Sequence, residues 1–192
     1  MEHTLGPEAV GELLAHLRAS RERVVRALDG LSEHDVRRPM TASGTNLLGL
    51  VKHLLGVEVG YLGDSVGRPL DPPLPWYADG SVWQDADMWA RPEESREHLV
   101  GQYRAAWARS DAAVAELGPG HPADVAWWPA ERRRTTLGRV LVRVAQDTAQ
   151  HAGQADVLRE LLAGRGADHA DRDDAYWTAY LAQVGAAADR FR

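Results

Sequence analysis

The chain has 192 residues and a net charge of −6, with 44% of its residues hydrophobic and 26% charged. This composition is that of a globular protein; it excludes a disordered chain and argues against nucleic-acid binding. No apolar run approaches the roughly 18–20 residues that cross a bilayer, and no secretory signal is visible. We therefore expect one cytoplasmic domain over 1–192, with no membrane or nucleic-acid partner.

The chain contains no cysteine. This excludes disulfides, zinc sites built on cysteine and a thiol nucleophile from the chain itself. Any metal ion must be held by His, Asp or Glu, and any thiol chemistry needs a thiol supplied by another molecule. Lys52 is the only lysine, and the many Ala and Gly residues are typical of a GC-rich genome, such as an actinobacterial one.

The first part of the chain contains two helical patterns, in which apolar residues recur at three- and four-residue spacing. The first helix is expected over about 7–31, with Pro7 and Gly30 as its punctuation. After a polar connection, the second helix is expected over about 45–66, with Thr45 as its N-cap.

The segment 67–80 contains four prolines, which exclude a helix through most of it. We expect a long, ordered crossover loop there. This region is unusually aromatic for a loop, and such side chains are expected to pack on the body of the protein or to wall a pocket. The candidates for a pocket wall are Trp76, Tyr77 and Trp83.

Three further helices are expected after the crossover. One runs from near Pro92 to the residues before Gly118, and its first turn holds glutamates that suit the helix dipole. After a short extended piece at 125–129, a long helix is expected over about 135–163 and a final one over about 173–189. No strand-periodic segment of useful length occurs. The predicted fold is therefore all-α: a four-helix bundle with a long crossover loop and a C-terminal helix.

Asp147 and His151 lie along the apolar stripe of the long helix predicted over 135–163. They are four residues apart, so their side chains are stacked neighbours. Burying a carboxylate or an imidazole alone is costly, and a shared cation would offset this cost. The alternative without a metal is a mutual hydrogen bond, extended by Arg143 one turn before Asp147.

His53 is the candidate on the second predicted helix, where it lies at the border of the apolar face. A histidine in such a place is also commonly a boundary residue with no ligand role. Glu58 falls nearer the centre of the apolar stripe than His53 does. It is therefore a rival ligand, or a carboxylate that orients a ligating histidine.

Residues 46–54, Asn-Leu-Leu-Gly-Leu-Val-Lys-His-Leu, followed by Glu58, resemble the second-helix motif of the DinB/YfiT-like metalloprotein superfamily. Residues 147–156 and 158–160 resemble the later-helix motif of the same superfamily, and 31–39 resemble the segment that leads into the second helix. These matches follow one another in the expected order over most of the chain. Together they are far more specific than any one of them.

The resemblance implies a four-helix bundle with a divalent metal ion at one end, held in many members by three histidines. The chain most resembles the branch that includes mycothiol-dependent maleylpyruvate isomerase, in which a carboxylate replaces one histidine of the later pair. The ligands implied here are His53, Asp147 and His151, a set that leaves coordination positions open for water or substrate. Asp147 is one methylene shorter than the Glu expected there. The supporting residues or rival ligands are Glu58, Gln154 and Arg143.

The same resemblance implies a small-molecule enzyme that uses the metal and mycothiol, or another low-molecular-weight thiol, as a transferase or an isomerase. Zinc is the expected ion, although nickel, iron and manganese suit the same ligands. Three alternatives stay open: a metal-dependent hydrolase, a non-catalytic metal-binding or stress-response protein, and a bundle without a metal. A homodimer formed through an exposed helix face is also open.

Overall fold

The computed structural model describes residues 5–165 and 172–192. The chain divides into two compact units, Met1–Arg159 and Glu160–Arg192, and each is described by itself. The expectation of one domain over 1–192 stays a prediction.

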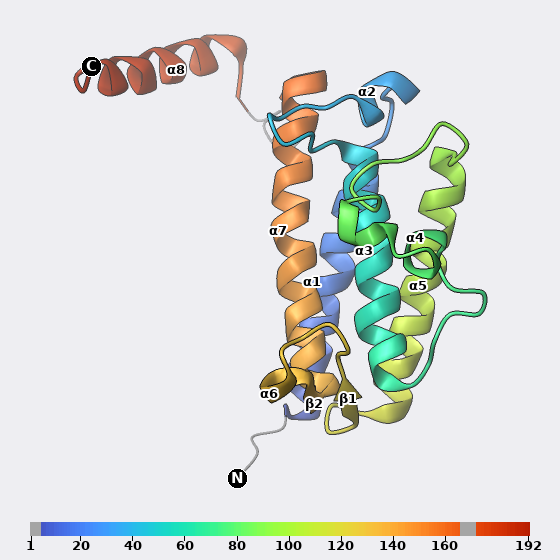
Figure 1. Ribbon diagram of the computed structural model, residues 1–192. Coiled ribbons are helices and arrows are strands. Elements are labelled where there is room, and N and C mark those ends of the chain that lie inside the picture. Colours follow the sequence, from blue (N-terminus) through green and yellow to red (C-terminus); the bar gives the residue numbers. More distant parts are fainter. Residues whose placement is uncertain (1–4, 166–171) are drawn as a thin grey trace. The chain divides into compact units, whose positions relative to one another are not determined.

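Four long helices form the bundle of the first unit (Figure 1). The all-α prediction is confirmed, since helices dominate the described residues and the only sheet among them has two short strands. The long helices are α1 (Pro7–Arg26), α3 (Leu47–Leu62), α5 (Arg96–Leu117) and α7 (Leu137–Ala163).

Short elements connect the long helices. The strands pair antiparallel, with Ala123 opposite Thr135, and this hairpin lies at the end of the bundle where α3 ends and α7 begins (Figure 1). The short elements are α2 (Glu33–Arg37), η1 (Asp64–Val66), α4 (Pro75–Ala78), η2 (Ser81–Gln84), β1 (Pro122–Asp124), α6 (Ala130–Arg133) and β2 (Arg134–Thr136).

Several predicted boundaries differ from the structure. The N-cap of α3 is Asn46, whose side chain accepts a hydrogen bond from the Gly49 N–H, and not Thr45. Helix α5 begins at Arg96 with Ser95 as its cap, later than predicted, because a serine hydroxyl satisfies a free N–H of the first turn. The extended piece expected at 125–129 is wrong: the strand lies three residues earlier.

Helix α3 is the central element of the bundle. Every residue of α3 is buried except His53 and Tyr61. Most of its residues are apolar because other elements cover the helix on nearly all sides. The two exceptions lie on one side of the helix, where the functional site is found.

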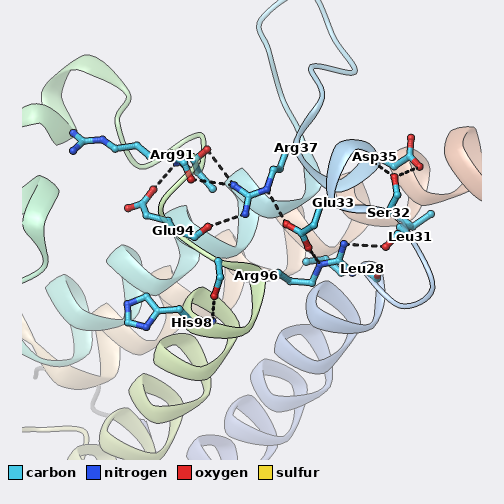
Figure 2. Close-up of polar contacts among 12 residues, drawn as sticks. Leu28, Leu31, Ser32, Glu33, Asp35, Arg37, Arg91, Glu94, Arg96 and His98 are labelled. Atoms are coloured by element: carbon cyan, nitrogen blue, oxygen red, sulfur yellow. Dashed lines mark hydrogen bonds and ion pairs between the residues drawn. The ribbon is translucent and has the colours of Figure 1, made fainter.

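Two arginines connect the start of α5 to its neighbours by hydrogen bonds (Figure 2). These bonds lie at the end of the bundle opposite the hairpin (Figure 1). The guanidinium of Arg37, on α2, donates to the backbone carbonyls of Arg91 and Glu94 at 3.1 and 2.7 Å. Arg96, in the first turn of α5, donates to the carbonyl of Leu31 at 2.9 Å. These bonds fix the end of the crossover that begins after α3.

The second unit contains α8 (Asp174–Asp189), close to the predicted 173–189. Its N-cap is Asp173, which accepts from the Tyr176 N–H at 2.8 Å. Within residues 5–165 and 172–192, no helix combines the length and the apolar character needed to cross a membrane.

Candidate metal centre

The fold brings His53, Asp147 and His151 together. Each offers one ligand atom, and these atoms all lie within 4.8 Å of one another. The Nε2 atom of His53 is 3.8 Å from Oδ2 of Asp147, and the rings of the two histidines meet edge to face with centroids 4.9 Å apart. Residues 94 positions apart in the sequence, 147 − 53, thus converge at one point between α3 and α7.

The i,i+4 spacing of Asp147 and His151 explains why α7 contributes two of the three groups. The flanking stripe of Val144, Thr148 and Ala155 is buried, so it turns this face of α7 inward. The Asp147 and His53 side chains are only 13% and 24% exposed. The candidate ligand groups are therefore partly withdrawn from water but still reachable.

Asp87 holds His53 in its orientation. The Nδ1 atom of His53 donates to Oδ2 of Asp87 at 2.7 Å, which leaves Nε2 as the free ring nitrogen on the side of Asp147. A ligating histidine in proteins commonly donates its other N–H to a carboxylate in this way. Asp87 lies between η2 and α5, and no regular sequence spacing relates it to His53.

Three residues of α3 and its cap hold the segment 87–89 against the helix. The Asn46 side-chain amide donates to the Met88 carbonyl at 3.2 Å, and Lys52 Nζ donates to the Trp89 carbonyl at 3.1 Å. Between them, Gly49 leaves room for the backbone: a Cβ there would lie 2.0 Å from the Met88 carbonyl oxygen. The residue types in the run 46–53 are therefore explained by the contacts they make. Asn46, Gly49 and Lys52 hold the segment that carries Asp87, and His53 donates a hydrogen bond to Asp87.

Gln154 and Arg143 also lie beside the three residues. His151 Nδ1 donates to Oε1 of Gln154 at 2.8 Å, which leaves its Nε2 free, as in His53. An Nη atom of Arg143 lies 3.7 Å from Oδ1 of Asp147, one helical turn away. Both side chains thus contact a ligand group, one through an imidazole and the other through the carboxylate.

Glu58 lies elsewhere. Its side chain is fully buried, and both of its carboxylate oxygens accept from Arg21, at 2.7 and 2.8 Å. Arg21 also donates to Asp111 at 2.8 Å. Glu58 is not among the residues that the fold brings to His53. Its carboxylate instead forms an ion pair with Arg21, which belongs to α1.

The charges of the cluster shift the pKa values of its members. Burial alone would lower the pKa of His53, but contact with the Asp147 and Asp87 carboxylates raises it to about 9. Burial opposes ionisation of Asp147, yet its contact with His53 and the charges of His151 and Arg143 lower its pKa. Burial and the charge on His53 lower the pKa of His151. The side chains alone therefore hold one positive imidazole between two carboxylates.

A cavity of about 380 Å³ opens beside His53 and Asp147. Of the three predicted wall residues, Tyr77 and Trp83 line it, whereas Trp76 does not: it is buried beneath Lys52, whose Nζ lies 4.6 Å from the ring centroid. The remaining lining comes from α3, α7, the crossover and the β1–α6 connection: Val57, Tyr61, Asp64, Val82, Asp87, Trp127 and Arg143.

The donor set fits a divalent ion. Two imidazoles and a carboxylate converge, and both imidazoles have a hydrogen bond on Nδ1 that leaves Nε2 free. Such sets bind zinc, nickel, iron or manganese and leave positions for an exchangeable ligand. The adjoining cavity gives a small molecule access to those positions.

Comparison with known proteins supports the fold and identifies the family. A conserved protein from Enterococcus faecalis of known crystal structure matches with a TM-score of 0.56 and 15% sequence identity, over 81% of this chain and 97% of that one. This likeness concerns the fold alone. No curated protein matches. The family model described as mycothiol-S-transferase matches residues 12–164, most of the chain, and the protein therefore belongs to this DinB-like family.

Proposed function

We propose that this protein transfers a low-molecular-weight thiol, mycothiol, to an electrophilic small molecule, with a divalent ion held by His53, Asp147 and His151. The observation that carries the proposal is the convergence of three ligand atoms within 4.8 Å beside an open cavity. The family match supports the thiol, and the absence of cysteine from the chain is consistent with a thiol that comes from a cosubstrate.

A bound divalent ion would lower the pKa of a coordinating thiol and so provide a thiolate near neutral pH. In the transfer, the sulfur forms a bond to an electrophilic carbon, the leaving group departs with its electron pair, and the thiol proton passes to solvent. The protein supplies orientation: Asp87 and Gln154 hold the two imidazoles. The aromatic walls, Tyr77 and Trp83 among them, exclude water from part of the cavity.

Zinc is the proposed ion. Two imidazoles and one carboxylate are a common ligand set of catalytic zinc sites, which keep a fourth position open. Nickel, iron and manganese are the other ions that suit these ligands. Elemental analysis of protein purified without chelator identifies the ion that is actually carried.

The experiment measures metal content and mycothiol conjugation together. His53→Ala and His151→Ala are expected to lose the ion and the conjugation while they remain folded by circular dichroism. His98→Ala is the matched control, because His98 is an exposed histidine on α5 outside the cluster. Conjugation that survives both substitutions contradicts the proposal, and turnover of an ester or amide without thiol would indicate the hydrolase instead.

A further inference from the structure

The cavity has a second polar end, away from the metal ligands. His53 and Tyr61 are the two residues of α3 that are not buried, and both line the cavity. They lie eight residues apart on the same side of the helix, which places them about 12 Å apart along its axis. Asp64, in η1, lines the cavity just beyond Tyr61.

The hydroxyl of Tyr61 receives two hydrogen bonds. The indole Nε1 atoms of Trp127 and Trp128 donate to it, at 3.2 and 3.1 Å. An indole N–H only donates, and a phenol oxygen accepts at most two bonds, so the acceptor capacity of this oxygen is filled. What remains is its own proton, which donates to no group within the described residues.

The surroundings hold this hydroxyl in place. The rings of Tyr61 and Trp127 meet edge to face with centroids 5.0 Å apart. Trp127 in turn packs against Gly60, where a Cβ would lie only 3.1 Å from its ring. The Tyr61 hydroxyl is therefore a positioned donor and not a freely rotating surface group.

Asp64 supplies an acceptor at the same end. Its carboxylate accepts from the backbone N–H of Leu70 and lies near Arg109, and partial burial raises its pKa. Flat apolar surface is available beside Tyr61, because Trp127 contacts its ring and is 39% exposed. A donor, an acceptor and an exposed indole ring thus lie at one end of the cavity.

We propose that this end, formed by Tyr61, Asp64 and Trp127, binds the polyhydroxylated ring of the thiol cosubstrate. A sugar or cyclitol hydroxyl both donates and accepts, so it can receive the Tyr61 proton and donate to Asp64. The apolar C–H face of such a ring fits against an indole. The inference rests on the proposed function, since a thiol bound in this way extends its sulfur about 12 Å along α3 to the metal ligands.

The test compares two thiols that differ in the polyhydroxylated part. Mycothiol carries such a part and N-acetylcysteine does not. In Tyr61→Phe and Asp64→Asn, KM for mycothiol is expected to rise at least tenfold, because a ring hydroxyl of the bound thiol loses its hydrogen-bond donor in the first variant and its charged acceptor in the second. KM and kcat for N-acetylcysteine, and the metal content, are expected to stay unchanged. Asp79→Asn, which lies outside the cavity lining, is the matched control.

A binding measurement separates this inference from the proposed function. S-methylmycothiol keeps the polyhydroxylated part but has no thiol to react, and its binding is followed by tryptophan fluorescence. If the wild type transfers neither thiol but binds S-methylmycothiol, and Asp64→Asn weakens that binding, the proposed function fails and the inference stands. If S-methylmycothiol binds equally to the wild type and both variants, or if the variants lose both thiols equally, the inference is overturned. Asp64→Asn decides the outcome should Tyr61→Phe fold poorly with its two indole N–H groups unpaired.

Discussion

The imidazole of His53 donates to the carboxylate of Asp87 at 2.7 Å, across 34 positions of the sequence. This bond leaves the free ring nitrogen of His53 on the side of Asp147, which belongs to another helix. Asp87 therefore orients the candidate ligand on α3, although it is remote from α3 in the sequence.

Replacing Asp87 by Asn is expected to weaken metal binding about 10- to 100-fold, since removal of a carboxylate that orients a ligating histidine has effects of this size. Competition with a coloured chelator measures the affinity. Asp85→Asn is the control, because Asp85 is exposed and its positive φ of 59° is tolerated by Asn. Equal affinities of the Asp87→Asn variant and the wild type would show that the bond has no role in metal binding.

Gly49→Ala is expected to destabilise the fold by about 1–3 kcal/mol, the usual cost of forcing an atom into a packed site. The added Cβ would meet the Met88 carbonyl, so either α3 or the segment with Asp87 must move. Denaturant unfolding measures the free energy, and chelator competition is expected to show weaker metal binding as well. Gly153→Ala is the matched helical control, because nothing lies within 4 Å of its Cβ position. Unaltered stability and affinity in Gly49→Ala would mean that the segment shifts without consequence.

Metal binding is expected to depend on pH because an ion and a proton compete for His53. With the pKa of His53 raised to about 9, binding must release that proton at every pH below this value. His151, whose pKa is lowered from 6.5, is already neutral there. The affinity is thus expected to rise about tenfold per pH unit from pH ~7 to pH ~9 and then to level off. Chelator competition in a series of buffers tests this, and a flat profile over the same interval contradicts it. In Asp87→Asn, the levelling is expected at lower pH.

Glu58→Ala is expected to destabilise the fold by about 3–5 kcal/mol, the usual cost of breaking a buried ion pair, since it leaves the buried Arg21 with Asp111 as its remaining carboxylate partner. Arg21 and Glu58 are both fully buried. The Glu58→Ala protein that remains folded is expected to bind the metal with the same affinity as the wild type, because Glu58 contacts Arg21 and not His53. A loss of metal binding without a loss of stability would instead identify Glu58 as a ligand. Glu116→Ala, an exposed glutamate paired with Arg68, is the control for stability.

The periodicity of apolar residues predicted the long helices, because each helix buries apolar residues. It also predicted that Asp147 and His151 are neighbours, because residues four positions apart on a helix lie on the same face. Glu58 shows the limit of the same reasoning. Its place near the centre of an apolar stripe is compatible with a metal ligand and with a buried ion pair. Only the position of Arg21, on another helix, decides between them.

Asp87, Trp127 and Trp128 could not be predicted as partners of α3. They lie in connections whose paths depend on contacts with distant elements, such as the close approach of Met88 to Gly49. The composition of the crossover suggests an aromatic wall, and Tyr77 and Trp83 line the cavity. Trp76 could not be told apart from them, because composition does not reveal which ring is covered by Lys52.

Two groups of residues line the cavity. His53 and Tyr61 belong to α3, whereas the second group belongs to the crossover: Tyr77, Val82 and Trp83. The spacing between the first two follows from the pitch of α3 and cannot change without remodelling the core. The crossover wall can change residue by residue without disturbing that spacing. Relatives with altered crossovers are therefore expected to accept different electrophiles while they keep the same thiol, so the two substrate preferences can diverge independently.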